Sequence, residues 1–261
     1  MTRPDRGQTL VYKRSFSALL IPAVALLVGL ARYPETRPIA ILLSVMAALL
    51  TTHLVGVVLA AVLAGTPIEK VALFNGPRLV LLNVRHVELS LNLIPMSASV
   101  SLPGFGFSGG EACEGGFGCL HMKWRLTISA AGPLALFLIG CACIGAGPAA
   151  ESVARGFYQV AVGAFAPLSH GQSLLRQAES LIVSQQLVTT LGVLAAKFCA
   201  ISLLPIPSTN GGRLVMELFR SKISEQTARR LNITGLIISM VIFIGWSVAG
   251  VALALHSLRS S

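Results

Sequence analysis

The stretch LLPIPSTNGGRL, residues 203–214, joins a long apolar run to a polar, basic one. Its two prolines, its asparagine and its pair of glycines make a turn the expected local structure at this boundary. Asn210 stands directly before the glycine pair, and its amide has the shape of an Asp carboxylate without the negative charge. The other segments of the chain indicate why a neutral side chain, and not a carboxylate, is found at position 210.

The apolar run before the turn is one of several in this chain. Of the 261 residues, 54% are apolar and only 11% are charged, far from the balance of a soluble globular protein. A bilayer core of roughly 30 Å needs about 20 apolar helical residues. The sequence therefore predicts an α-helical polytopic membrane protein with about five transmembrane helices. They are expected near 15–32, 38–64, 127–147, 184–204 and 231–255.

The net charge of +10 is distributed as in a membrane protein. With the N-terminus in the cytoplasm, 14 Lys and Arg residues fall inside and 5 outside, while Lys197 lies within a span. This bias matches the excess of basic residues in cytoplasmic loops. No basic patch is interleaved with aromatics, so we expect no nucleic-acid partner. We expect a bacterial inner-membrane protein that contacts the lipid bilayer and has a cytoplasmic N-terminus.

The first apolar run has a second interpretation. Basic residues precede it, and Gly29-Leu30-Ala31 is similar to a cleavage site, so residues 1–31 can be a signal peptide. The run exceeds the usual apolar length of about 7–15 residues in such peptides, which favours a transmembrane helix. Both interpretations place the start of the second span outside.

The loop 66–126 is too long to be a simple connection, and it has the alternation of strands. Apolar and polar residues alternate in VELSLNL (87–93) and again, after Pro95, in MSASVSL (96–102). This period-2 pattern predicts an amphipathic hairpin or small sheet. It must lie at the membrane face or against protein, because open strands cannot face lipid.

The predicted segments are a tail with the first helix (1–37), a membrane core containing this cytoplasmic loop (38–220), and a cytoplasmic segment with the last helix (221–261).

Acidic residues are absent from all five predicted spans. The predicted membrane core therefore contains no carboxylate that can act as a base or as a metal ligand. The acids of the chain are Asp5, Glu35, Glu69, Glu88, Glu111, Glu114, Glu151, Glu179, Glu217 and Glu225.

Four segments, taken in order, resemble the intramembrane site-2-type zinc metalloproteases. They are THLVGVVLAAVLAGTPIEKVALFNGPRL (52–79), LNLIPMSASVSLPG (91–104), WRLTISAAGPLALF (124–137) and LLPIPSTNGGRL (203–214). The likeness runs from about residue 45 to 220. It implies a site-2-protease-like membrane core whose strand loop is cytoplasmic, in agreement with the distribution of basic residues.

The resemblance also implies a zinc site, and this chain departs from it. In that family an H-E-x-x-H helix holds Zn²⁺ and supplies the general base, an Asp before Gly is the third ligand, and an Asn after Ala-Gly-Pro polarises the substrate carbonyl. Here His53 occupies the first His position, Leu54 replaces the Glu and Val57 the second His. Asn210 replaces the Asp, and Leu136 replaces the Asn. Because catalytic zinc usually has three protein ligands, we expect no catalytic residue and no zinc cofactor at these positions.

The expected absence of zinc explains why a neutral Asn, and not an Asp, occupies position 210. Without zinc, a carboxylate there would be an uncompensated charge at membrane depth, which costs several kcal/mol. The sequence thus predicts a non-catalytic pseudoprotease that binds or regulates a transmembrane segment of another protein. One alternative is an active zinc metalloendopeptidase with unorthodox ligands, such as His53, Asn210 and a loop residue. Another is a small-molecule or ion conduit that uses Lys197.

The predicted strands are the candidate partner-binding elements. In the resembling family such strands receive an extended substrate by edge addition, a mode with a clear physical basis; packing of the strands as a lid is the alternative. The expected binding residues are Val87, Leu89, Leu91, Met96, Ala98 and Val100.

Three further features each have a functional and a structural interpretation. Lys197 is the one basic residue well inside a span, where charge is a functional candidate, although snorkelling explains it equally well. His53 can hydrogen-bond across helices instead of binding a metal. The cluster of Cys113, Cys119 and His121 can bind a metal, but its spacing is unlike that of common zinc sites.

Overall fold

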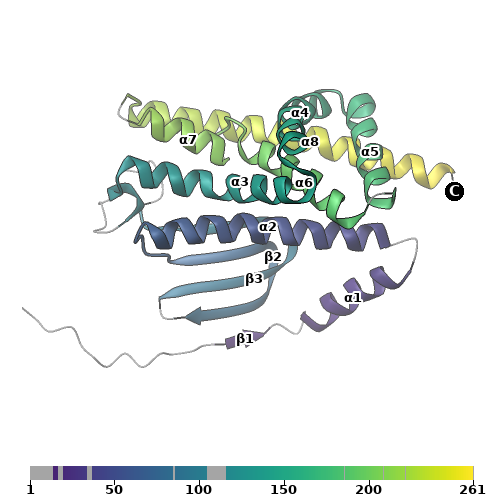
Figure 1. The fold of residues 1–261 in the computed structure, drawn as a ribbon, viewed down its shortest axis with the longest axis horizontal. Helices are drawn as coiled ribbons and strands as arrows, with labels where there is room; N and C mark the ends of the chain where they lie inside the picture. Colours follow the sequence, from purple (N-terminus) through teal and green to yellow (C-terminus); the bar gives the residue numbers. More distant parts are fainter. Residues whose placement is uncertain are drawn as a thin grey trace, which may run out of the picture.

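The computed structural model describes residues 14–16, 20–33, 37–84, 86–104, 116–184, 186–207, 209–220 and 222–260. The fold is mostly helical, at 73%, with one small three-stranded sheet, which confirms the predicted class. The elements in chain order (Figure 1) are β1 (Arg14–Phe16), α1 (Leu20–Arg32), α2 (Arg37–Leu63), β2 (Lys70–Val84), β3 (Val87–Ser101), η1 (Phe117–Cys119), α3 (Met122–Ile144), α4 (Ala146–Phe165), η2 (Pro167–Gly171), α5 (Gln172–Ser184), α6 (Leu187–Ser202), α7 (Asn210–Leu218) and α8 (Glu225–Ser260).

Three of the described helices are long and apolar enough to cross a membrane: Arg37–Leu63, Met122–Ile144 and Gln226–Leu253. They lie close to three of the five predicted spans. The five-span count is not confirmed, because α6 has 16 residues and the described α1 has 13. At 1.5 Å rise per residue both are shorter than the roughly 30 Å bilayer core. Apolar side chains such as Val55, Leu59 and Val62 on α2 are more than half exposed, as lipid-facing residues are.

The helices pack in layers around α3. Figure 1 shows the sheet on one side of α2 and α3 on the other, followed by α7 and α8. The buried cluster of α2, α3 and α6 consists of Val45, Leu49, Leu136, Ala195 and Cys199. This core holds together α2 and α3, two of the three helices that carry the sequence-predicted site; the third, α7, carries Asn210.

The sheet confirms strands in the loop but corrects their pairing. Residues 70–73 of β2 pair on one side with 88–91 and on the other with 98–101. The two alternating runs of β3 therefore do not form a hairpin with each other, because the start of β2 lies between them. The chain turns within β2, where Phe74 and Gly76 have φ angles of 71° and 84°, and residues 80–84 then pair with 87–91. The short β1 pairs with residues 80–82.

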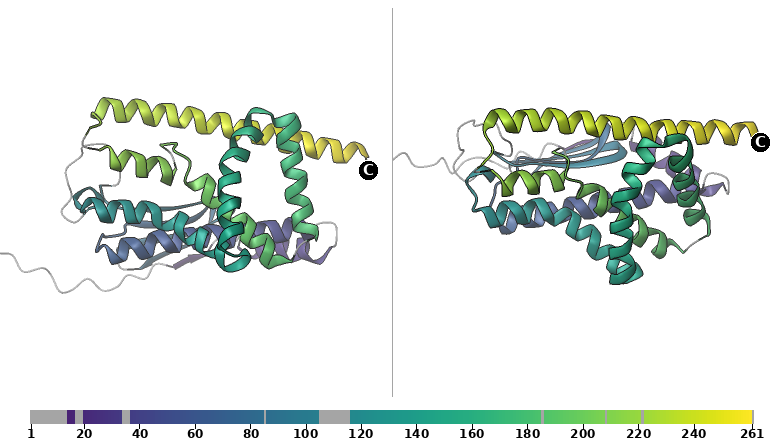
Figure 2. Two further views of the ribbon diagram at one scale, coloured as in Figure 1. Left: turned by 45° about the horizontal axis from the view of Figure 1, so that its top comes forward. Right: turned by 90° about the horizontal axis from the view of Figure 1, so that it is seen from above.

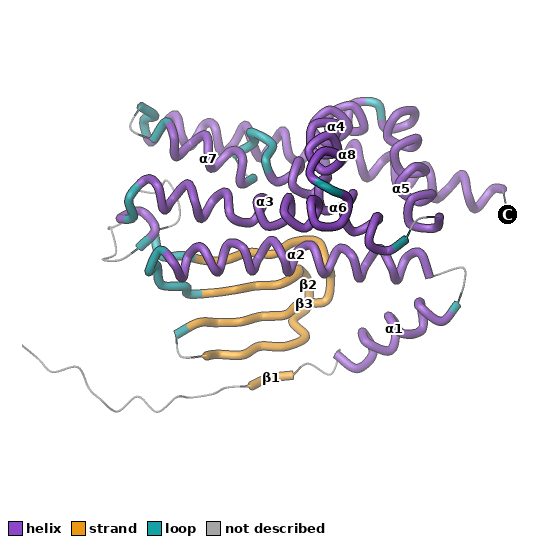
Figure 3. The backbone as a smooth tube through the Cα atoms, in the orientation of Figure 1, coloured by secondary structure: helices purple, strands orange, loops and turns teal. Residues whose placement is uncertain are grey.

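One edge of the sheet lies beside the helices. Figure 3 shows the sheet running along α2. Val100, in the 98–101 segment, packs against a buried cluster that contains Ala60 and Ala61 of α2, Leu102, Phe117 and Ile128, and Val57 packs against the same cluster. In the described part of the chain, no strand pairs with the outer side of residues 98–101.

The segment α4–η2–α5 forms a helical hairpin that stands across the direction of α2 and α8 (Figure 2). Its close approach to α8 depends on Gly163, because a Cβ at this position would overlap the Trp246 ring. The indole N–H of Trp246 donates to the Val160 carbonyl oxygen at 3.1 Å. These contacts tie the hairpin to the long C-terminal helix.

Candidate functional site

His53 and Asn210, 157 residues apart in the sequence, are hydrogen-bonded. The Asn210 Nδ2 lies 2.6 Å from the His53 Nε2, and both side chains are partly buried. With the amide in this orientation, an Asn210 N–H donates to Nε2, so the imidazole proton is assigned to Nδ1. The structure therefore brings together the two polar side chains that the sequence placed at metal-ligand positions.

The His53 ring fits against α3 because Gly132 has no side chain. A Cβ at Gly132 would overlap the His53 ring, including its Nε2. One turn along α2, a Cβ at Gly56 would lie 2.7 Å from the Ala131 carbonyl oxygen. These two glycines let α2 and α3 approach closely, and they place His53 between the helices. The Ala-Gly-Pro motif at 131–133 was the sequence signal for this contact.

Asn210 is positioned by the turn that precedes it. The Thr209 hydroxyl accepts from the Gly212 N–H at 3.3 Å and caps α7. Its own proton lies within donating distance of the carbonyl oxygens of Leu204, at 2.5 Å, and Ile206, at 2.9 Å. A Cβ at Gly211 or Gly212 would overlap the backbone of residues 203–206. The glycine pair is thus required for the helix to start directly against its own turn, with Asn210 as its first residue.

The other three family positions carry apolar side chains in the core. Leu54 is 8% exposed, and Leu136 is 1% exposed in the cluster shared by α2, α3 and α6. Val57 packs against the buried cluster that contains Ala60 and Ala61, as Val100 does. None of these side chains has an atom that can bind a metal or move a proton.

The residues present do not fit a catalytic zinc ion. The donor atoms at the site are one imidazole nitrogen and one neutral amide, whereas such zinc sites usually use three protein ligands. Among the described residues, no group of three or more His, Cys, Asp and Glu side chains could hold a metal. Of the loop cluster, Cys113 lies outside the described residues, Cys119 is exposed, and the His121 Nδ1 accepts from the Lys123 N–H at the start of α3.

The predicted partner-binding residues lie at two different places in the sheet. Val87, Leu89 and Leu91 lie in the interior run, whereas Ala98 and Val100 lie in the edge segment. The side chain of Met96 lies outside the described residues. Within the sheet, the Lys70 ammonium donates to the Glu88 carboxylate at 2.9 Å, and this hydrogen bond lowers the pKa of Glu88 below its ordinary value.

Lys197 does not join the His53 site. Its Nζ donates to the Gln159 Oε1 at 2.6 Å, across the α4–α6 contact. The two helices also approach closely at Gly156, where an added Cβ would lie 2.7 Å from the Ala200 Cβ. Gln159 could not be predicted as the partner of Lys197, since it is 38 residues away in the sequence and lies in an ordinary amphipathic segment.

A buried ion pair links α3 to α7. The Arg125 Nε lies 2.9 Å from the Glu217 Oε2, and these side chains are only 14% and 8% exposed. Arg220 adds a second cation 3.4 Å from Glu217, and Arg125 also donates to the Gly118 carbonyl oxygen. This pair could not be predicted from the sequence, because no local pattern marks two charges 92 positions apart as partners.

These features define a class of protein: a helical membrane protein with a site-2-protease-like core, in which the first-His position on α2 and the Asp position on α7 are in contact. The family model of peptidase family M50 matches residues 41–244, about four-fifths of the chain. The chain belongs to peptidase family M50, a membrane protease family that is normally zinc-dependent. A search among curated proteins finds no match.

Proposed function

We propose that this M50 chain is a non-catalytic membrane protein that binds a transmembrane segment of a partner without cleaving it. The observation that carries the proposal is the direct hydrogen bond between His53 and Asn210. The imidazole nitrogen that would face a metal in a family protease is here taken up by a neutral amide. No positively charged ion is needed to stabilise this pair.

The absent groups support the same proposal. A general base contributes about 10²–10⁴ in rate, and metal activation lowers the pKa of water to about 7. Leu54 and Val57 supply neither a base nor a second imidazole ligand. The chain keeps the family fold and the close contacts among α2, α3 and α7. We propose that this scaffold can still bind a transmembrane segment of a partner.

Zinc content tests the loss of catalysis. Protein purified from membranes without chelator is expected to contain far less than one zinc per chain, because His53 and Asn210 alone are poor ligands. The measurement is elemental analysis of the wild type beside His53→Ala. One tightly held zinc per chain, removed by His53→Ala, would overturn the proposal in favour of the active metalloendopeptidase with unorthodox ligands.

The partner-binding element we propose is the edge segment 98–101. It offers backbone hydrogen-bonding groups without a strand partner in the described chain. Its Val100 packs on the same cluster as Val57, which is one helical turn from His53. An extended segment added to this edge would therefore run beside the altered site, with main-chain hydrogen bonds supplying affinity.

Proline substitutions test edge pairing. Consecutive N–H groups of a strand point to opposite sides. Of the two variants Ala98→Pro and Ser99→Pro, one therefore removes an N–H on the open edge and the other removes a hydrogen bond to β2. The variant that loses the open-edge N–H should keep the wild-type thermal stability, and it is expected to lose most co-purification of a partner from native membranes. Ser99→Thr is the matched control. Ser90→Pro should destabilise, because Ser90 is 6% exposed and pairs on both sides. Undiminished capture by both edge variants would argue against this surface.

We also propose the orientation in an inner membrane with the N-terminus in the cytoplasm. Support comes from one end of the bundle, where the start of α3, the end of α7 and the start of α8 lie together (Figure 1). Basic residues including Lys123, Arg220 and Lys222 belong to these segments. Basic residues are in excess on the cytoplasmic side of membrane proteins, so this end of the bundle is assigned to the cytoplasm.

Cysteine labelling tests this orientation. In a background without the native cysteines, Lys222→Cys is expected to react only after the membrane is permeabilised, and Ser169→Cys in η2 to react in intact cells. Both native side chains are exposed. Labelling of Lys222→Cys from outside would reverse the proposed topology.

A further inference from the structure

A cavity of about 340 Å³ lies among α4, α5, α6 and α8, away from His53. Most of its lining side chains are apolar, including Val160, Leu174, Leu175, Leu181, Val193 and Leu194. Its volume is near the lower end of the roughly 300–1,000 Å³ of small-molecule sites. The size suits one acyl chain rather than a two-chain lipid.

The cavity also contains a cation for which the described residues supply no counter-ion. Lys197, Gln159 and Trp246 are part of its lining. The Lys197 ammonium is half-buried and donates to the neutral Gln159 amide, and no acidic side chain of the described residues forms an ion pair with it. Nearby Arg155 has the same sign and pairs with Glu151 on the exposed face of α4. An ammonium held only by an amide favours an anion as its further partner.

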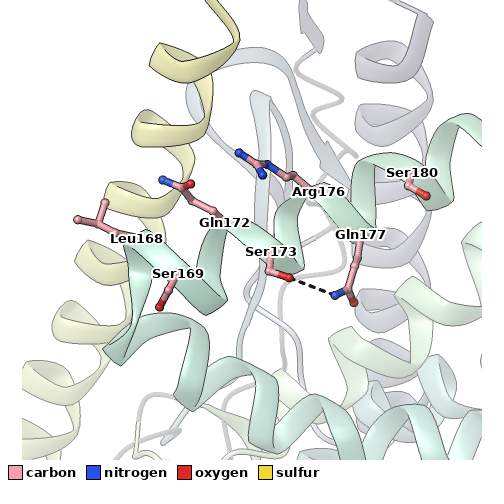
Figure 4. A pocket seen from close by; sticks show the side chains of 7 residues that line it. All are labelled: Leu168, Ser169, Gln172, Ser173, Arg176, Gln177 and Ser180. Carbon is pink, nitrogen blue, oxygen red and sulfur yellow. Dashed lines mark hydrogen bonds between the residues drawn. The ribbon is translucent and has the colours of Figure 1, made fainter.

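The two faces of α5 place this cavity at a boundary between polar and apolar surroundings. Leu174, Leu175 and Leu181 face the apolar cavity. The opposite polar side lines a second, open cavity of about 420 Å³ with Ser169, Gln172, Ser173, Arg176, Gln177 and Ser180 (Figure 4). Gln177, which donates to the Ser173 hydroxyl, lines both cavities, so the two adjoin at this side chain.

From these observations we infer that the α4–α5–α6–α8 cavity binds a single-chain carboxylate amphiphile, a fatty-acid anion. Its carboxylate accepts from the Lys197 ammonium and from the N–H groups of the Gln159 amide, whose oxygen remains bonded to Lys197. Its chain lies along the leucines of α5 and the ring of Trp246. This site goes beyond the partner-binding function proposed for the sheet edge, because it uses other residues and another class of ligand.

Trp246 provides a direct reporter for the test, because the chain has only two tryptophans. Trp124→Phe removes the other one, and the variant chain is placed in nanodiscs of zwitterionic lipid. The probe is bromoundecanoate, a fatty acid whose bromine quenches indole fluorescence on contact. Quenching is expected to saturate, and Lys197→Met should raise the apparent dissociation constant at least tenfold. Lys197→Arg, which keeps the charge, should raise it much less.

The methyl ester of the same probe controls for partition of bromine into lipid. It is expected to bind more weakly than the acid and to act equally on the wild type and Lys197→Met. Thermal melting of each variant checks that it is folded. Unsaturable quenching by the acid, equal binding of acid and ester, or an unchanged constant in folded Lys197→Met would each overturn the inference. Saturable quenching only by a brominated transmembrane peptide with one Glu would instead assign the cavity to a protein segment.

Discussion

The triple variant Leu54→Glu, Val57→His and Asn210→Asp is expected to bind one zinc ion per chain and to melt at a clearly higher temperature with zinc than with chelator. The three changes restore H-E-x-x-H beginning at His53 and supply a carboxylate at 210. Structural zinc contributes about 10 kcal/mol or more to folded metal-binding peptides. Elemental analysis and melting curves with zinc or EDTA provide the measurements.

The geometry supports this expectation. The side chain of residue 210 already reaches the Nε2 of His53 at 2.6 Å, so the two side chains need to separate only slightly for one zinc ion to bind both. Position 57 is four residues after 53 and lies on the same helix face. A histidine there adds volume beside the buried cluster that contains Ala60 and Ala61, an overpacking cost of about 1–3 kcal/mol. Zinc binding exceeds that cost.

Two controls separate metal binding from general damage. Adding His53→Ala to the triple variant should abolish zinc binding, because one of three ligands is lost. Leu54→Glu alone should destabilise the protein, since Leu54 is 8% exposed and an acid there has no metal to pair with. A folded triple variant that binds no zinc would show that the core no longer has the family geometry. Leu136→Asn can then be added to the triple variant to restore the family's Asn. The prediction concerns zinc binding and does not require that proteolysis returns.

Glu217→Leu is expected to lower the free energy of unfolding by about 3–5 kcal/mol, the usual effect of removing one member of a buried ion pair. The change leaves the guanidinium of Arg125, only 14% exposed, without its carboxylate, and it removes the partner of Arg220. Because the pair joins α3 to α7, its loss should also loosen the turn that positions Asn210. Denaturant or thermal unfolding in detergent gives the measurement.

The matched control is Glu151→Leu. Glu151 and Arg155 form an i,i+4 pair whose side chains are 61% and 69% exposed, and such pairs contribute only about 0.3–0.5 kcal/mol. The double variant Arg125→Met and Glu217→Leu should recover much of the lost stability, because no buried charge then remains unpaired. Equal effects of Glu217→Leu and Glu151→Leu would contradict the buried role of Glu217.

The elements themselves could be predicted where the signal is local. The length of an apolar run decides whether a helix can cross a bilayer, so the spans expected at 38–64, 127–147 and 231–255 correspond to α2, α3 and α8. The alternation in residues 87–102 likewise predicted β3. The four family-like segments predicted the family that the comparison shows. Each of these signals depends on neighbouring residues alone.

Pairing was harder to predict, because it depends on elements that compete for the same edge. Both alternating runs of β3 have the pattern of a hairpin, yet residues 70–73 lie between them and hydrogen-bond to both. The run 70–73 is too short to show a strong period of its own. Sequence periodicity identifies which residues can form strands, whereas tertiary packing decides which strands are neighbours.

By itself, the sequence identified an M50 membrane protein, and its resemblance to that family assigns Leu54, Val57, Leu136 and Asn210 to the positions where a family protease has its ligands and polar catalytic groups. Only the tertiary structure decided that Asn210 bonds to His53, that Glu217 pairs with Arg125, and that Lys197 faces a cavity beside Gln159. Composition and periodicity follow from residues a few positions apart. These contacts instead join residues 157, 92 and 38 positions apart. At the first and the third, Gly132 and Gly156 let the helices approach closely.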